Sequence, residues 1–273
     1  ETLSDWPEDN IQAHLDRGHA KYWLSFNADT LAHHANMIRD TEAKGLMLHI
    51  ESRVEADRDV TEVMIYTQDH PGVFAAIAGA MSLSGASIVD AKIATLANGM
   101  ALDTFWVQDS NGDAFADKGR LKRLLARIED ALSGRIKPAR ELKSAQEKAL
   151  PSRIGAFKVP ARVLIDNKAS NSHTVVEING RDRPGLLHDL TTALTASGLQ
   201  IASAHISTYG ERVVDVFYIK DIFGLKVDNE EKTKALHASL LEIVSSSSAS
   251  KQDSGQGPGQ GKAAAKDEVK AAG

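Results

Sequence analysis

The sequence presents Asp69-His70-Pro71-Gly72-Val73-Phe74 and, 113 positions later, Asp182-Arg183-Pro184-Gly185-Leu186-Leu187. We call these stretches the first corner and the second corner. Each follows a β-branched run and precedes apolar residues at helical spacing. The same offset relates four further pairs downstream: Gly85 and Gly198, Ile88 and Ile201, Ala91 and Ala204, and Thr95 and Thr208. Because chance does not keep such a register over about forty residues, we infer two copies of one domain.

Length and composition set the class of protein. A chain of 273 residues can hold two domains of ordinary size. Its net charge of −5 argues against nucleic-acid binding, because such binding needs a concentrated basic surface. No apolar run reaches the ~20 residues of a membrane span. The absence of cysteine excludes disulfides and cysteine nucleophiles. Because the sequence opens at Glu1 without an initiator Met or a signal-like stretch, we expect a cytoplasmic piece of a longer protein.

The first repeat reads as strand, helix, strand, strand and helix. A β-branched run at 60–67 ends at the first corner, and the apolar residues that follow recur at i, i+3, i+4 and i+7. Two further strands flank Asn98-Gly99, a dipeptide typical of tight hairpins. A second amphipathic helix ends near Gly134. A last strand at 161–166 would complete the βαββαβ order of a ferredoxin-like domain.

The second repeat follows the same order and then stops. Its last helix is predicted at 230–244, and the chain beyond is rich in Ser, Gly, Gln, Lys and Ala, which predicts disorder. The second repeat would therefore lack a fourth strand of its own. Its open sheet edge would be covered by segment 46–50 or by pairing between the repeats.

The predicted fold is α+β, with two ferredoxin-like domains in tandem. Residues up to 27 are predicted to be irregular, and 52–59 to be a loop. The predicted segments are a connector at 1–59 with a helix at 28–43 and a strand at 46–51, a first domain at 60–168 that includes a basic linker at 134–160, a second domain at 171–244, and a disordered tail at 245–273.

The Asp-x-Pro-Gly corner favours two interpretations. Pro fixes φ and suits a first helical turn, while Gly lets a ligand approach the backbone. Free N–H groups and the positive end of the helix dipole then form a natural carboxylate site. Alternatively, the corner is only a tight turn whose Asp caps the helix. With two copies, the residues alone support binding and turn about equally.

The full strings narrow the family. A strand closed by Asp-x-Pro-Gly, a helix ending in Gly and a hairpin together resemble the ACT domain, a module that binds amino acids at domain interfaces. The longer strings at 180–187, 203–218 and 100–109 resemble the C-terminal tandem ACT region of the bacterial bifunctional uridylyltransferase/uridylyl-removing enzymes, which modify the PII signal protein. Tyr22-Trp23-Leu24-Ser25-Phe26 resembles the segment that precedes the first ACT domain in that family. The resemblance covers about residues 20–244.

This resemblance implies a regulatory region that senses glutamine and controls UMP transfer to PII and its removal. The implied ligand contacts are the corner residues and one residue early on each following strand: Asp69, His70, Gly72, Val73, Ile88, Asp182, Arg183, Gly185, Leu186 and Ile201. Arg183 replaces His70 in the second corner and pairs more strongly with a carboxylate. We therefore expect the second corner to be the stronger site.

Catalytic and metal motifs are missing from the sequence. The implied whole enzyme is a nucleotidyltransferase and phosphodiester hydrolase that needs Mg²⁺, but no Gly-Ser followed by paired carboxylates occurs here. His188-Asp189 spells the HD pair, yet its counterparts in the first repeat are Ala75 and Ala76, and a metal needs ligands from further helices. No cofactor, metal, nucleic acid or membrane partner is expected for this fragment.

Two alternatives stay open. The chain could be a free-standing ACT-repeat sensor that acts on another enzyme. It could also be a structural module in which ACT domains pair within or between chains and both corners are turns.

Overall fold

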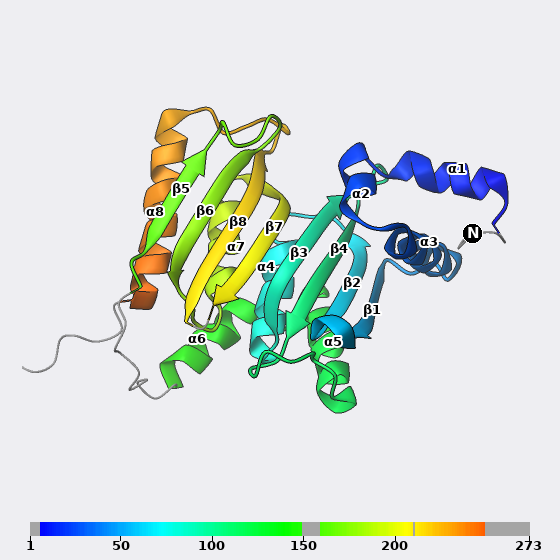
Figure 1. Cartoon of the computed structure of the whole chain (residues 1–273), viewed down its shortest axis with the longest axis horizontal. Helices are drawn as coiled ribbons and strands as arrows, with labels where there is room; N and C mark the ends of the chain where they lie inside the picture. Colours follow the sequence, from blue (N-terminus) through cyan, green and yellow to red (C-terminus); the bar gives the residue numbers. More distant parts are fainter. Residues whose placement is uncertain (1–5, 149–158, 210, 249–273) are drawn as a thin grey trace, which may run out of the picture.

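The chain forms one eight-stranded antiparallel sheet with helices on both faces (Figure 1). This computed structural model describes residues 6–148, 159–209 and 211–248. The strands are β1 (Leu48–Glu55), β2 (Val60–Gln68), β3 (Ser87–Thr95), β4 (Met100–Gln108), β5 (Arg162–Asp166), β6 (Thr174–Arg181), β7 (Leu199–Tyr209) and β8 (Arg212–Asp221). They lie in the order β1-β2-β4-β3-β7-β8-β6-β5.

Eight α-helices accompany the sheet within the described ranges. They are α1 (Glu8–Arg17), α2 (Ala20–Ser25), α3 (Ala28–Ala43), α4 (Val73–Leu83), α5 (Lys118–Leu132), α6 (Pro138–Lys148), α7 (Leu186–Ala196) and α8 (Glu230–Ser248). In this part of the chain no helix is long and apolar enough to span a membrane.

The predicted tandem of ferredoxin-like repeats is confirmed, but each repeat takes its edge strand from the segment before it. Both halves read strand, strand, helix, strand, strand, helix. β1 pairs with β2 from Leu48 opposite Thr67 to Glu55 opposite Val60. β5 pairs with β6 in the same way. The sheet of each half therefore has four strands.

This topology corrects three strand predictions. Segment 161–166 does not complete the first repeat, the second repeat does not lack a fourth strand, and segment 46–50 does not cover the edge of the second repeat. The physical reason is chain proximity: only residues 167–173 separate β5 from β6, and only 56–59 separate β1 from β2. Such short connections favour antiparallel neighbours.

Four segments also differ from their predicted local structure. The stretch up to 27 is not irregular, because it contains α1 and α2, and the predicted loop at 52–59 continues β1 to Glu55 and then forms a 3₁₀ turn at Ala56–Arg58. The predicted linker contains α6, which begins at Pro138, a residue suited to a first helical turn. Ser245–Ser248 belong to α8, whereas 249–273 lie outside the described residues. The helix predicted at 28–43 is confirmed as α3.

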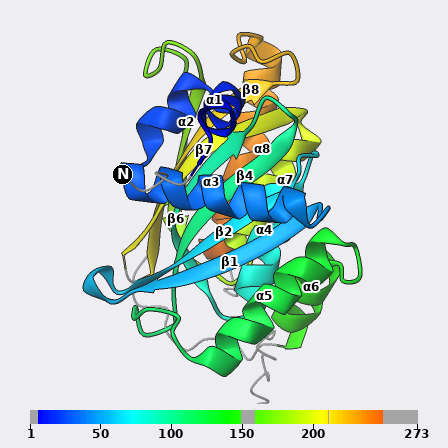
Figure 2. The same ribbon diagram turned by 90° about the vertical axis from the view of Figure 1, so that its right-hand side faces the viewer.

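The two faces of the first half are covered by different helices. Val63 and Ile65 on β2 face the main core with α4 and α5, whereas Met64 and Tyr66 point the other way and pack against α2 and α3. Figure 2 shows α3 lying across the strands of this half. Because successive side chains of a strand alternate between faces, β2 is buried on both sides.

The halves join through equivalent elements. β3 pairs antiparallel with β7, and Ala91 lies opposite Ala204, its counterpart in the repeat. Behind the sheet, His188 on α7 donates from Nδ1 to the carbonyl oxygen of Ala75 on α4 (2.7 Å), and these residues are also 113 positions apart. An approximate twofold axis therefore relates the repeats, and each corner lies beside the seam between them.

Candidate functional site

Both corners turn a strand into a helix through a left-handed glycine. Gly72 (φ 95°) precedes α4 and Gly185 (φ 82°) precedes α7. No side chain caps either helix. Asp69 Oδ2 instead accepts a hydrogen bond from Thr95 Oγ1 (2.6 Å), and Asp182 accepts one from the backbone N–H of Arg183. The interpretation of each Asp as a helix cap is therefore wrong, and both helix starts keep backbone donors and a positive dipole end.

The second corner is built into a cavity of about 240 Å³ at the seam between the repeats. Residues 182–188 form one wall, residues 85–88 of the first repeat form another, and Asp215 on β8 also lines the space. This volume is below the usual range for drug-sized ligands and suits a small molecule. The cavity therefore combines a helix start, an apolar wall from the other repeat and a buried acid.

The cavity brings together half of the predicted contacts. Asp182, Arg183, Gly185, Leu186 and Ile88 line it. Ile88 thus lies with the corner of the other repeat, although the sequence placed it after the first corner. The pairing of β3 with β7 across the seam causes this exchange. The remaining predicted contacts lie elsewhere: Asp69, His70, Gly72, Val73 and Ile201.

The first corner is more open. His70 is exposed whereas its counterpart Arg183 is half-buried, and Gly72 is half-buried whereas Gly185 is buried. Helix α6 causes part of this difference, because Gln146 Nε2 donates to the carbonyl oxygen of Pro184 (3.0 Å). A Cβ added at Gly185 would lie 3.3 Å from Leu142 of the same helix. The α6 helix, missed in the sequence, therefore covers the second corner.

Arg183 of the second corner and His188, one residue beyond it, are held by the protein itself. Arg183 Nη1 forms an ion pair with Asp189 Oδ2 (2.7 Å), and His188 is turned towards Ala75. Among the described residues no group of three or more His, Asp or Glu could hold a metal ion. His188 and Asp189 therefore make separate structural contacts, with Ala75 and Arg183, and do not bind one metal ion together.

Sequence reasoning missed a buried acid in each repeat. Asp215 is 2% exposed, and burial, followed by the charge of Asp182, raises its pKa to about 8. Its counterpart Asp103 is equally buried, and burial, followed by the charge of Asp69, raises its pKa well above the usual value. The sequence pattern that could have revealed these acids is an Asp at the same place in two apolar strands, Val214-Asp215-Val216 and Leu102-Asp103-Thr104.

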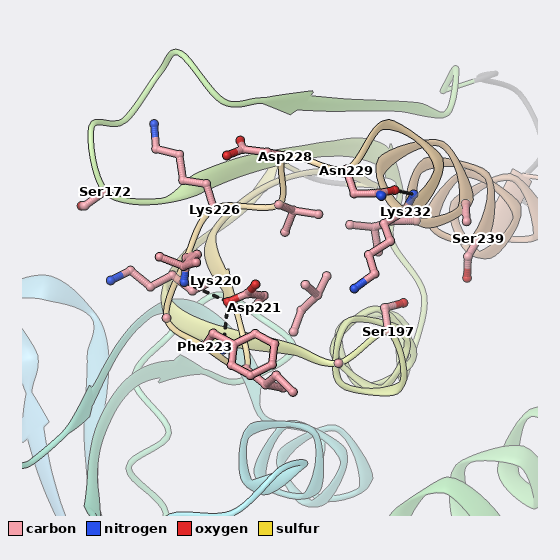
Figure 3. Close-up of a pocket in the computed structure, with 18 of the residues that line it drawn as sticks. Ser172, Ser197, Lys220, Asp221, Phe223, Lys226, Asp228, Asn229, Lys232 and Ser239 are labelled. Atoms are coloured by element: carbon pink, nitrogen blue, oxygen red, sulfur yellow. Dashed lines mark hydrogen bonds between the residues drawn. The ribbon is translucent and has the colours of Figure 1, made fainter.

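A larger cavity of about 1090 Å³ lies at the far end of the second half (Figure 3). Its wall includes Phe223 and Asp221 at the end of β8, and Lys232 on α8. None of the predicted site residues, all of which are described, lines this space. Asp221 is engaged by the backbone N–H groups of Phe223 and Leu225. The ammonium group of Lys226 donates hydrogen bonds to two backbone carbonyl oxygens, so the protein already uses two of its three donors.

Comparison with known proteins identifies the class. A family profile described as "ACR9-like, ACT-like domain" matches residues 162–247. The match begins at the first residue of β5, which agrees with the pairing of that strand with the second repeat. The second repeat therefore matches an ACT-like domain, and the duplicated fold has the architecture of two ferredoxin-like ACT domains in tandem.

Full-length relatives identify the particular proteins that it resembles. The chain is 48% identical over 240 residues to the bifunctional uridylyltransferase/uridylyl-removing enzyme of Gluconobacter oxydans, covering 88% of this chain and 25% of that enzyme. It is 48% identical over 248 residues to the enzyme of the same name from Azospirillum brasilense, covering 90% and 26%. The predicted resemblance to the C-terminal region of these enzymes is confirmed.

The chain spans about a quarter of the length of the curated relatives that it matches. An aspartate kinase from Synechocystis is 16% identical to this chain, with a TM-score of 0.35, over 68% of this chain and 27% of the kinase.

Proposed function

We propose that this chain is the amino-acid-sensing regulatory region of a bifunctional uridylyltransferase/uridylyl-removing enzyme, with glutamine bound at the second corner. The observation that carries this proposal is the cavity of about 240 Å³, where the start of α7 meets Ile88 and residues 85–87 of the other repeat. The helix start offers backbone donors to a carboxylate, and the apolar wall fits the aliphatic part of an amino acid.

The seam location supports a regulatory role. A ligand in this cavity touches both repeats at once, so its binding energy depends on how the repeats sit against each other. A regulatory ligand acts by binding two arrangements with different affinity. In the whole enzyme, we propose that glutamine favours UMP removal from PII in the cytoplasm. PII as partner and Mg²⁺ for UMP transfer belong to this proposal for the whole enzyme.

The first prediction concerns Gly185. Isothermal titration should detect glutamine binding to the wild-type chain. Gly185→Asp should weaken it by more than about tenfold, because the new side chain crowds Leu142 and adds a negative charge at the start of α7, where the ligand carboxylate would bind. Gly112→Asp is the matched control, since Gly112 has a similar φ of 87° with open space around its Cβ position. This control should bind as the wild type does.

The outcomes separate the alternatives. Wild-type binding that is lost in Gly185→Asp and kept in Gly112→Asp supports sensing at the second corner. No heat at millimolar glutamine contradicts the proposal and favours a structural module. Loss in Gly72→Asp alone would move the site to the first corner. Assays of UMP transfer and removal by the whole enzyme, with PII as substrate, distinguish the two sensing alternatives: an effect of glutamine on these activities supports a regulatory region of that enzyme, and no effect favours a free-standing sensor.

A further inference from the structure

The second-corner cavity contains a buried carboxyl group with an unused oxygen. Asp215 Oδ1 has no hydrogen-bond partner among residues 6–148, 159–209 and 211–248. The backbone N–H of Ser207 donates a hydrogen bond to the same side chain. A buried polar atom without a partner costs free energy unless something satisfies it. Because Asp215 lines the cavity, a ligand there is the natural partner.

The surroundings of Asp215 leave its charge uncompensated by the protein. Its register partners on the neighbouring strands are Ile178 on β6 and Ile206 on β7. The titratable groups that share the cavity are Asp182, Arg183 and His188. Asp182 is an acid at the exposed mouth, Arg183 is paired with Asp189, and His188 donates to Ala75. The charges that line the cavity therefore favour a cationic group of a ligand at Asp215.

The cavity has two ends of opposite polarity. The start of α7 offers N–H donors and a positive dipole end, which suit an anion. Asp215 and Asp182 supply carboxyl groups, which suit a cation. An α-amino acid carries both charges on neighbouring atoms, so it matches this arrangement better than a plain carboxylic acid does.

We propose that Asp215, with Asp182 at the cavity mouth, is the ammonium-recognition point of the second corner, so that the site accepts α-amino acids and discriminates against their deaminated analogues. This inference rests on the proposed amino-acid-sensing function. It deepens that function by assigning the amino group of the ligand to residues outside the corner motif.

Proton release is a direct consequence. The raised pKa of Asp215, about 8, keeps most of this carboxyl protonated at pH 7 in the free protein. An ammonium group beside it favours the ionised form, so binding expels the proton. Glutamine should bind more tightly as the pH rises from 6 to 8. It should also release up to about one proton per site at pH 7.

The test uses glutamine and glutaramic acid, which is glutamine without its α-amino group. Isothermal titration of the wild-type chain, in two buffers of different ionisation enthalpy, measures affinity and proton release together. We expect glutamine to bind at least about tenfold more tightly than glutaramic acid, as for a charge-assisted hydrogen bond to a buried group. Asp215→Asn should reduce this preference to less than about threefold and abolish proton release.

Glu62→Gln is the matched control. Glu62 is a buried acid whose pKa is also raised by burial, and it lies on β2 outside the cavity, where Arg53 pairs with it. This variant should keep the amine preference and the proton release. Circular dichroism checks the fold of both variants. If Asp215→Asn does not fold, the wild-type affinities for glutamine and for glutaramic acid still test the proposal.

Each outcome has a distinct meaning. Equal wild-type affinity for the two ligands overturns the ammonium assignment and leaves the sensing function standing. An unchanged preference in Asp215→Asn also overturns it. Failure of both ligands to bind the wild type contradicts the sensing function itself.

Discussion

Asp103 and Asp215 occupy equivalent places in the middle of β4 and β8, and burial raises the pKa of both carboxyl groups. In the unfolded chain these acids would ionise near the ordinary value of 3.8. For Asp215 between that value and about 8, and for Asp103 above that value, the folded chain therefore binds more protons than the unfolded chain. Folding stability contributed by these groups is present at low pH and is lost as the pH rises through this window.

The pH dependence of stability tests this argument. Urea titrations at pH 5 and pH 8 should show a lower free energy of unfolding at pH 8 for the wild type. The double variant Asp103→Asn, Asp215→Asn should lose less between the two pH values, because its amides cannot ionise. The exposed Asp57, when changed to Asn, should leave the wild-type difference intact. An identical pH difference in wild type and double variant would refute the raised pKa values.

Helices and strands with strong periodicity were predictable from the sequence. α3 falls where the pattern predicts it, because its start coincides with a cap: Asn27 Oδ1 accepts a hydrogen bond from the backbone N–H of Thr30. α6 was missed because its charged face dominates the composition and its buried Leu142 is easily overlooked. The predicted partners of the two edge strands were wrong, because the sequence pattern of a strand does not show which neighbouring strand it pairs with.

Some features of the candidate site were predictable from the sequence and others were not. The corners were predictable, since Pro and Gly impose a local conformation that two copies make recognisable. The contribution of Ile88 to the opposite corner was not, because it depends on the pairing of β3 with β7. The acid at Asp215 was visible in the sequence, but its burial beside the cavity needed the structure.

The packing of α6 and α7 against α4 gives an element-scale prediction. A Cβ at Gly79 on α4 would lie 2.5 Å from Pro138 Cβ and 2.8 Å from His188 Nδ1. Gly79→Ala should therefore destabilise the chain by about 1–3 kcal/mol, the usual cost of overpacking. Gly119→Ala on α5 meets its nearest atom at 3.4 Å. It should instead stabilise by about 0.5–1 kcal/mol, since Ala favours helix over Gly.

Thermal or urea unfolding of the two glycine variants provides the measurement. Stabilisation of Gly79→Ala comparable to that of Gly119→Ala would show that α6 and α7 do not approach α4 as closely as the structure indicates.

At the scale of the whole molecule, two copies of one unit share a continuous sheet and a helix seam. Equivalent residues meet across this seam, as Ala91 meets Ala204 and His188 meets Ala75. The second corner uses the seam as a wall, so ligand binding there is tied to the contact between repeats. Helix α6 covers the second corner and gives the two corners different surroundings, although their sequences are similar.

The location of glutamine on the chain is the most direct test of this account. A titration of the ¹⁵N-labelled chain with glutamine, followed by amide chemical shifts, should perturb two groups together: residues 185–188 at the start of α7 and residues 85–88 of the first repeat. This joint perturbation is what binding at the seam predicts. Shifts confined to the larger cavity around Phe223 and Lys232, or no shifts at millimolar glutamine, would contradict it.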